Sequence, residues 1–300
     1  MTAHEPIPLA RPDLGEREEE MVLDVVRSGW LSLGPVLERF EREFARWLGV
    51  EDAVAVSSGT AGLHLGVRAL GWGSGDEVVT SPLSFVASAN CLLYEGAVPV
   101  FCDIDPLTLN LDPEAARAAV GSRTAGLLPV HVFGYPAAMP ELEALATRSG
   151  LGILEDACEA AGAVDASGVA VGARGNLAVF GFYANKQLTT GEGGMAIPPA
   201  SETAGLLRSE RNQGRARDPS SLSHERLGFN YRLSDLQAAI GVAQLERADR
   251  LLADRARVAA LYAERLEAMG ASPAGEGDPD GLCLPCAERG AERRSWFVFA

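Results

Sequence analysis

Hydrophobic residues recur at two different spacings along the chain, and each spacing predicts a different kind of element. At intervals of three and four they lie on one face of a helix, whereas short apolar runs bounded by turn residues are typical of buried strands. The clearest helical pattern is formed by Leu37, Phe40, Phe44, Trp47 and Leu48. Gly49 follows at once and is expected to end that helix. An earlier helix is expected to begin in a capping box, Asp13-Leu-Gly-Glu16, and to end near Gly29.

From residue 53 onward, apolar runs alternate with helical patterns. Buried strands are predicted at 53–56, 77–80, 98–101, 124–130 and 152–154, and helices between them at 61–70, 84–95, 113–120 and 140–149. In the third of these helices Asp112 is the expected N-cap, and Pro113 occupies the first helical position. Strands that alternate with helices build βαβ units. The chain is therefore predicted to be α/β, with a mostly parallel sheet flanked by helices.

The second half of the chain contains two more predicted strands and a long helix. An apolar run begins at Leu177, and a short apolar segment follows at 195–197 after a turn rich in Gly and Thr. A polar helix and a polar loop come next. Ser234 is then the expected N-cap of a helix that continues to about Met269.

The end of the chain differs in composition from the rest. A linker rich in Gly, Pro and Asp occupies 270–281, and residues 295–300 have the pattern of a strand that has just begun. An apolar strand at a chain terminus suggests an incomplete unit. We therefore expect a large α/β domain at 1–248, and at 249–300 the start of a small C-terminal domain that is truncated.

Composition and charge narrow the range of partners. The chain has 300 residues and a net charge of -15, which argues against nucleic acid and an anionic membrane surface as the main partner. The N-terminus has no signal-peptide pattern, and no stretch approaches the ~20 apolar residues of a membrane span. Five scattered cysteines are typical of a cytoplasmic protein. The lone pair Cys283 and Cys286 lacks the second pair that a zinc site needs, so no metal is expected.

One lysine directly follows the apolar run that begins at Leu177. It is Lys186, in the segment Asn185-Lys-Gln-Leu-Thr-Thr-Gly-Glu-Gly-Gly194. Lysine is almost never fully buried without a partner, and burial of an amine lowers its pKa from ~10.4 because it disfavours the ammonium form. A neutral amine at the mouth of a pocket can attack a carbonyl group and form a Schiff base. The simpler interpretation is a strand-end lysine whose ammonium group reaches solvent.

A second candidate lies at the end of the first predicted strand. Ser58, Gly59 and Thr60 stand directly before a helix. Backbone N–H groups at a helix N-terminus, with hydroxyl groups beside them, make a phosphate site, and glycine lets the ligand approach closely. The alternative is a plain helix cap. In open α/β sheets, ligands bind outside the carboxyl ends of the strands, which favours the phosphate site.

Two further strand ends hold unusual residues. Asp156 and Glu159 follow the strand at 152–154, and a buried carboxylate needs a partner such as a pyridinium N–H. The alternative is an acidic helix start. Phe85 follows the strand at 77–80, where it either stacks on a planar cofactor or belongs to the core. A phosphate cradle, a stacking ring, a carboxylate and a lysine are together what pyridoxal 5'-phosphate (PLP) requires.

The order of these motifs resembles that of the DegT–StrS family of sugar-nucleotide aminotransferases. The resemblance runs from about Ile7 to Gly241. Its most specific segments are Ser57-Ser-Gly-Thr-Ala-Gly-Leu-His64, Glu155-Asp-Ala-Cys158, Asn185-Lys-Gln-Leu-Thr-Thr-Gly-Glu-Gly-Gly194 and Gly228-Phe-Asn-Tyr-Arg232. It implies the aspartate-aminotransferase-type fold, also called the type I PLP fold. The implied reaction is PLP-dependent amination of a nucleotide-linked keto-6-deoxyhexose, with glutamate as the expected amino donor.

The resemblance also implies a role for each candidate. The residues expected around PLP are Ser58, Gly59, Thr60, Phe85, Asp156, Glu159, Lys186 and Asn230. Lys186 would hold the cofactor covalently and move protons, and Asp156 would keep the ring nitrogen protonated. Gly59 and Thr60 would hold the phosphate. Asn230 would reach the cofactor of the neighbouring subunit, so a homodimer is expected.

Two features depart from the family's pattern. Gly181 stands where the family usually has a serine that helps to bind phosphate, and family chains usually continue past the position of Ala300. Both features are compatible with an impaired or inactive family member that acts as a PLP-binding or regulatory subunit. A second alternative is the dehydratase branch of the family. That branch replaces the lysine with histidine, so Lys186 argues against it.

Overall fold

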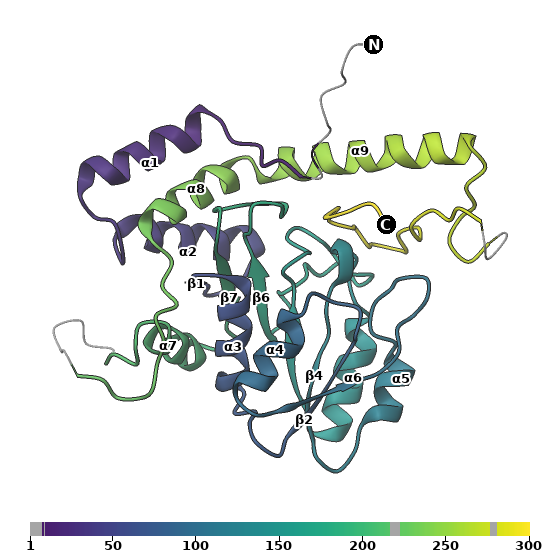
Figure 1. Ribbon diagram of the computed structural model, residues 1–300, viewed down its shortest axis with the longest axis horizontal. Coiled ribbons are helices and arrows are strands. Elements are labelled where there is room, and N and C mark those ends of the chain that lie inside the picture. The colour runs from purple at the N-terminus through teal and green to yellow at the C-terminus, as the bar shows by residue number, and fades with distance from the viewer. Residues whose placement is uncertain (1–7, 9, 217–222, 277–280) are drawn as a thin grey trace.

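Seven strands form a single sheet in the computed structural model, which describes residues 8, 10–216, 223–276 and 281–300 (Figure 1). The strands are β1 (Val54–Val56), β2 (Glu77–Thr80), β3 (Val98–Phe101), β4 (Thr124–Leu128), β5 (Gly152–Asp156), β6 (Leu177–Gly181) and β7 (Gly194–Ile197). Their order is β1-β7-β6-β5-β4-β2-β3. All neighbours are parallel except β7, which runs antiparallel to both β1 and β6. The predicted α/β class with a mostly parallel sheet is confirmed.

Helices cover both faces of this sheet. They are α1 (Glu16–Ser28), α2 (Pro35–Leu48), α3 (Gly59–Ala69), α4 (Ala87–Tyr94), α5 (Pro113–Ala119), α6 (Met139–Ser149), α7 (Ser201–Glu210), α8 (Asp235–Glu246) and α9 (Ala248–Ala268). Side chains that alternate along each strand divide the core into two sides. Val54 and Leu154 pack with α3, α4 and α7, whereas Ala55 packs with α1, α2 and α8. Ile153 packs with α5 and α6.

Buried aromatic rings anchor the strand that leads to the predicted site. Phe44 of α2 lies 5.3 Å from Phe180 and 5.6 Å from Phe182, measured between ring centroids. Phe40 packs on Gly241 of α8, where a Cβ atom would come within 2.6 Å of the ring. The helix α2 therefore packs against the end of β6, where the lysine segment begins, and α8 packs closely on α2.

Two predicted helix boundaries are wrong. The N-cap of α1 is Gly15, whose N–H donates to the Glu18 carboxylate at 2.9 Å, while Asp13 instead pairs with Arg247 at 3.1 Å. The long helix predicted from Ser234 is divided at Arg247 into α8 and α9. The φ and ψ angles of Arg247, -126° and 21°, do not continue the helix.

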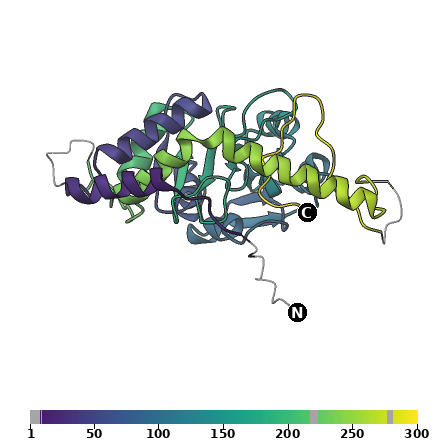
Figure 2. The same cartoon turned by 90° about the horizontal axis from the view of Figure 1, so that it is seen from above.

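The C-terminal segment also differs from its prediction. Residues 295–300, all of which the structure describes, form no strand. Seen from above in Figure 2, the segment runs beside α9. Hydrogen bonds hold it there: the Arg255 guanidinium of α9 donates to the carbonyl oxygens of Trp296 and Phe297 at 3.2 and 3.3 Å. The Ser295 N–H also donates to the Gly134 carbonyl oxygen at 2.9 Å. The backbone of this segment is therefore held by side chains and by one loop carbonyl, and not by a strand.

None of the helices in the described part of the chain is long and apolar enough to cross a membrane.

Candidate active site

A cavity of about 610 Å³ opens at the carboxyl ends of the parallel strands. Seven of the eight residues predicted around the cofactor line it: Ser58, Gly59, Thr60, Phe85, Asp156, Glu159 and Lys186. They come from segments that follow β1, β2, β5 and β6. Because the carboxyl ends of parallel strands lie at one edge of a sheet, segments far apart in the sequence meet here.

The first wall of the cavity is the N-terminus of α3. Ser58 caps the helix, since its Oγ accepts a hydrogen bond from the Ala61 N–H at 3.1 Å. The N–H groups of Gly59 and Thr60 belong to the first turn, where no intrahelical acceptor exists. A Cβ atom on Gly59 would lie 2.7 Å from the Cys158 sulfur. The turn therefore needs glycine, and it offers free donors at the positive end of a helix dipole, which suits a phosphate group.

Asp156 supplies a negative charge to the floor of the cavity. Its side chain accepts hydrogen bonds from the Ser88 hydroxyl at 2.7 Å and from the Cys158 N–H at 3.1 Å. The residue is buried, and no ion pair within the described residues includes it. Burial raises the pKa of the Cys91 thiol, and the nearby Asp156 carboxylate raises it further. A buried carboxylate without a cationic partner can accept the N–H of a protonated pyridine ring.

The neighbouring carboxylate, Glu155, points to the opposite side of the sheet. It accepts a hydrogen bond from the Nε2–H of His131 at 3.2 Å, because the Ala137 N–H occupies the other ring nitrogen at 3.0 Å. Asn176 also donates to Glu155, at 2.8 Å. Glu155 is therefore a structural residue. His131 is a buried histidine with both ring nitrogens hydrogen-bonded.

Lys186 projects into the cavity from the segment that follows β6. Its Nζ atom lies 3.3 Å from Glu159 Oε1 and 4.0 Å from the centroid of the Phe297 ring. Only 14% of the side chain is exposed, so the interpretation of a lysine that reaches into solvent is wrong. The second oxygen of Glu159 accepts the Phe133 N–H at 2.9 Å, which holds the carboxylate in place.

The segment that carries the lysine is fastened at both ends. The Phe182 N–H donates to Gly193 at 2.8 Å, and the Thr190 N–H donates back to Phe182 at 3.0 Å. Gln244 of α8 accepts the Thr189 N–H at 3.4 Å. These bonds close a compact loop between β6 and β7, with Lys186 at its tip.

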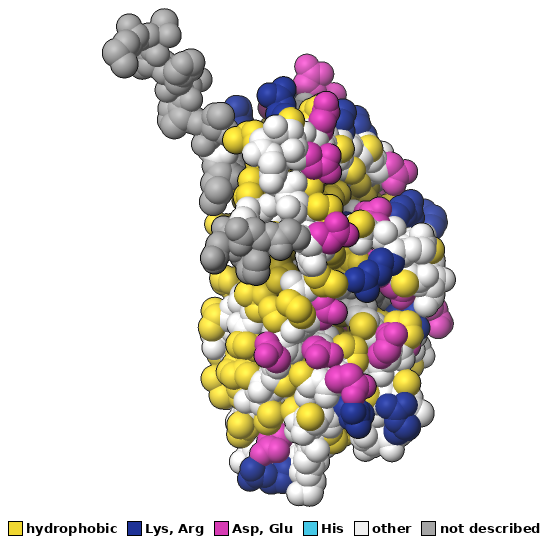
Figure 3. All heavy atoms as spheres, turned by 90° about the vertical axis from the view of Figure 1, so that its right-hand side faces the viewer, with side chains coloured by type: hydrophobic (Ala, Val, Ile, Leu, Met, Phe, Trp, Pro, Cys, Tyr) yellow, Lys and Arg dark blue, Asp and Glu magenta, His cyan; other side chains and the backbone are white. Residues whose placement is uncertain are grey.

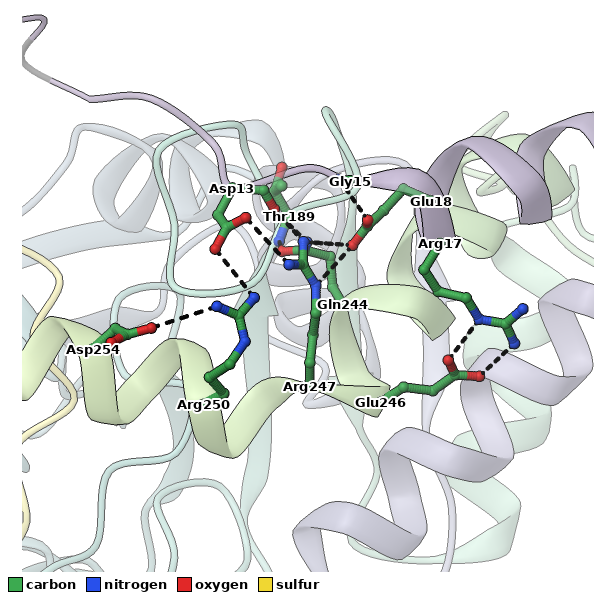
Figure 4. A network of polar contacts seen from close by, with 10 residues as sticks. All are labelled: Asp13, Gly15, Arg17, Glu18, Thr189, Gln244, Glu246, Arg247, Arg250 and Asp254. Atoms are coloured by element: carbon green, nitrogen blue, oxygen red, sulfur yellow. Dashed lines mark hydrogen bonds and ion pairs between the residues drawn. The ribbon is translucent and has the colours of Figure 1, made fainter.

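A polar network connects this loop with the N-terminal segment and the break between α8 and α9 (Figure 4). Gln244 donates to Glu18 at 2.8 Å, and Arg247 donates to the same carboxylate at 2.7 Å. Burial disfavours the charged form of Glu18, but hydrogen bonds from Gln244, the Gly15 N–H and Arg247 outweigh it and lower the pKa of this carboxyl group. Glu18 is therefore an ionised buried residue that holds α8 to α1.

Gly181 and Cys158 lie together under the phosphate cradle. A Cβ atom on Gly181 would come within 3.2 Å of Cys158 Cβ and 3.3 Å of its sulfur. Burial, with a contribution from Asp156, raises the pKa of the Cys158 thiol well above its ordinary value, so this cysteine stays protonated. The thiol occupies part of the space that a serine at position 181 would need.

Asn230 stands apart from the other predicted residues. It is exposed, pairs with Asn212 in an isolated antiparallel bridge, and does not line the cavity. Its predicted contact with a neighbouring subunit stays a prediction.

The residues present fit PLP. The amides of α3 suit its phosphate, Asp156 suits its ring nitrogen, and Lys186 suits its aldehyde. A further observation points the same way: Asn185 lines the cavity, and its side-chain oxygen is buried without a hydrogen-bond partner among the described residues. A buried oxygen of this kind needs a donor, which a polar ligand can supply.

The sequence patterns did not reveal four residues in or beside the cavity. Asn185 and Phe297 line it, whereas Ser88 and Arg255 hydrogen-bond to residues that line it. The sequence itself distinguishes Lys186, which is the only lysine among 26 basic residues.

Comparison with known proteins identifies the family. The sequence profile of the DegT/DnrJ/EryC1/StrS aminotransferase family matches residues 12–281. The chain belongs to this family. The resemblance predicted from the motifs is thereby confirmed, and with it the PLP-dependent aminotransferase class and the type I fold.

Several members of the family are similar over most of the chain. GDP-perosamine synthase from Caulobacter vibrioides is 42% identical over 266 residues, which are 88% of this chain and 71% of that protein. The structure of DesV from S. venezuelae, in complex with a ketimine intermediate, has a TM-score of 0.85 at 37% identity and covers 94% of this chain and 72% of its own. The aminotransferase TlmJ from Streptoalloteichus hindustanus has a TM-score of 0.90 at 34% identity and covers 98% and 78%.

Proposed function

We propose that this aminotransferase transfers an amino group from glutamate to a keto-6-deoxyhexose that is linked to a nucleotide, using PLP bound covalently to Lys186. The observation that carries the proposal is the position of this single lysine, which lies in the same cavity as a buried carboxylate and a free helix N-terminus. The similarity to a relative named GDP-perosamine synthase supports a nucleotide-linked sugar as the acceptor.

The residues of the cavity divide the work. The α3 amides of Gly59 and Thr60 bind the phosphate, and Phe85 stacks on the ring. Bound PLP supplies an electron sink that withdraws charge from the carbon bearing the transferred nitrogen. Asp156 holds the proton on the ring nitrogen, which keeps that sink strong. Lys186 removes a proton from the reacting carbon and returns it, and Glu159 orients the amine.

We further propose a homodimer in which Asn230 of one subunit binds the cofactor phosphate of the other. Exposed hydrophobic side chains on the segment from Phe85 through α4 and β3 support a second copy as their cover, and the first of them lines the cavity: Phe85, Val86, Leu93, Tyr94, Val98 and Phe101. Figure 3 shows hydrophobic side chains gathered along one edge of the molecule and charged ones toward the opposite edge. Asn230 is exposed and does not line the cavity of its own chain, which also supports the proposal.

Two coarser features belong to the same proposal. Residues 1–248 would form the cofactor domain and 249–300 part of a smaller one, and the helix break at Arg247 supports this division. A cytoplasmic location is supported by the five cysteines, all of which are free thiols.

Reduction with borohydride tests the role of Lys186. Because the chain has a single lysine, borohydride treatment after addition of PLP should add one pyridoxyl group, and peptide mapping should place it on Lys186. Lys186→Ala should take up none at this site. Mass spectrometry of the products from a panel of nucleotide keto-sugars, with glutamate as donor, then tests the substrate. A folded protein that stays unlabelled in excess PLP contradicts the proposal.

A subunit-exchange experiment tests the shared site. Lys186→Ala should abolish activity, and Asn230→Ala should weaken it, because a charge-assisted bond to phosphate contributes ~1.5–3 kcal/mol. Mixed dimers should regain activity, since one of their two pockets contains both an intact lysine and an intact asparagine. If exchange is verified and activity does not rise, Asn230 serves the cavity of its own chain.

A further inference from the structure

Arg255 of α9 is a partly buried arginine without a carboxylate partner among the described residues. Its guanidinium donates instead to four backbone carbonyl oxygens. Two belong to the lysine loop, Asn185 at 3.4 Å and Lys186 at 2.8 Å, and two to the C-terminal segment, Trp296 at 3.2 Å and Phe297 at 3.3 Å. Burial lowers the pKa of Arg255, so the surroundings disfavour its charge. Burial of a charged group costs free energy, and the hydrogen bonds to these four carbonyl oxygens offset that cost.

The two segments that Arg255 joins carry the side chains that meet at the amine. Lys186 Nζ lies 4.0 Å from the centroid of the Phe297 ring. A second hydrogen bond between these segments comes from Gln187, whose side-chain amide donates to the Ser295 carbonyl oxygen at 2.9 Å. The two backbones share no strand pairing. The planar fork of the guanidinium can donate in two directions at once, which the ammonium group of a lysine cannot do with the same geometry.

We propose that Arg255 is a positioning residue for Lys186: it joins the lysine loop to the C-terminal segment and thereby fixes the Phe297 ring over the amine. The proposal rests on the proposed role of Lys186. The ring and Glu159 occupy two sides of the amine, so the amine is directed toward the remaining space in the cavity. Without Arg255, the C-terminal segment would lose two of its backbone bonds, and the ring would leave the amine open to solvent.

Amine labelling of the full 300-residue chain tests this proposal. Lys186 is the only lysine, so its side chain and the N-terminal amine are the two primary amines that acetic anhydride can acetylate, and the N-terminal amine serves as an internal reference in peptide mapping. The labelling is done before PLP is added. In Arg255→Met, the ratio of Lys186 labelling to N-terminal labelling should rise about tenfold, equivalent to ~1.4 kcal/mol of lost protection. Arg255→Gln, which keeps one amide donor and adds no second lysine, should fall between the wild type and Arg255→Met.

Three comparisons separate positioning from a general loosening of the helix. Arg257→Met is the matched control, because Arg257 lies two residues away on α9 and is exposed, with Asp254 as its partner. It should leave the ratio unchanged. Phe297→Leu should raise the ratio about as much as Arg255→Met, because both changes remove the ring from the amine. The double variant should then equal either single variant.

The outcomes decide the proposal. Three results would each overturn it: a wild-type labelling ratio in Arg255→Met, an equal rise of the ratio in Arg257→Met, or a rise in the double variant equal to the product of the two single rises. If the two variants at Arg255 do not melt cooperatively, Phe297→Leu decides the proposal. A wild-type labelling ratio in Phe297→Leu would mean that the ring does not shield the amine. Labelling needs no cofactor, so its failure is distinct from failure of the borohydride test, which concerns PLP chemistry at Lys186.

Discussion

Replacement of Asp156 by asparagine removes the negative charge of this side chain and keeps its size and shape. In the native protein the carboxylate accepts from both the Ser88 hydroxyl and the Cys158 N–H. An asparagine can keep both contacts. Its oxygen can accept the Cys158 N–H, while its NH2 group donates to Ser88, whose own proton then turns to the Phe85 carbonyl at 3.2 Å. No buried group loses its partner, so the free energy of unfolding should change by less than about 1 kcal/mol.

The effect on the cofactor should be larger, and the effect on the rate larger still. A hydrogen bond to a charged group contributes ~1.5–3 kcal/mol and a neutral one ~0.5–1.5 kcal/mol. Asp156→Asn should therefore weaken PLP binding by about 1–2 kcal/mol, or roughly 5- to 30-fold. The rate depends also on the ring proton, which a neutral amide does not retain. Loss of such preorganised charge typically lowers rates by about 10²–10³.

Single-turnover kinetics with glutamate, followed by the absorbance of the bound cofactor, measure this rate directly. Ser88→Ala is the control, because it removes one hydrogen bond to Asp156 and leaves the charge in place. Its rate should fall far less than that of Asp156→Asn, because the carboxylate that holds the ring proton keeps its charge and still accepts the Cys158 N–H. If Asp156→Asn reacts as fast as the wild type when saturated with PLP, Asp156 is only a structural acceptor. Equal losses in the two variants would also contradict the reasoning.

Two other predictions follow from the same region. Gly181→Ser should lower the free energy of unfolding by about 1–2 kcal/mol, because its Cβ crowds Cys158. Adding Cys158→Ala removes the sulfur contact but keeps the Cβ atom, so thermal melts should show a partial recovery of stability; if the melting temperature does not rise at all, the crowding argument is wrong. Through its new hydroxyl group, the double variant should also bind PLP more tightly in a titration. Glu18 has a lowered pKa in the folded state, so its ionised form stabilises the protein above the ordinary glutamate pKa of ~4.3, and that stability is lost as the pH falls through the lower folded value. Glu18→Gln should therefore be less stable by ~2 kcal/mol at neutral pH and show a flatter acid limb in pH-dependent melts, because glutamine offers Gln244 and Arg247 only one neutral acceptor.

Most elements of the sheet follow from local patterns. The predicted strand at 77–80 and that at 98–101 are observed with the same bounds, and the helix expected at 113–120 is observed at Pro113–Ala119. Alternation of apolar residues and helix caps are properties of short segments, so a sequence reveals them without knowledge of the fold. The position of ligand residues after strands follows equally, because parallel strands present their carboxyl ends at one edge.

Residues that depend on distant partners could not be predicted in this way. The apolar pattern of 234–269 is continuous, yet the helix divides at Arg247, whose guanidinium pairs with Glu18 of α1, 229 residues away in sequence. The same pairing draws Asp13 away from the helix cap that its motif suggested.

The conformation of the C-terminal segment beside the cavity also depends on distant partners. Its apolar residues favour a strand, and strand formation requires a neighbouring strand. In this fold Arg255 and Gln187 pair with its backbone instead.

The sequence by itself determined which residues can carry the chemistry: one lysine, a carboxylate after a strand, and a glycine at a helix start. Only the tertiary structure decided their surroundings. It turned Asp156 toward the cavity and Glu155 away from it, placed Phe297 over Lys186, and left Asn230 outside. The physical reason is that composition and periodicity act over a few residues. The position of a side chain in a cavity, in contrast, depends on contacts between segments brought together only when the sheet and its helices have assembled.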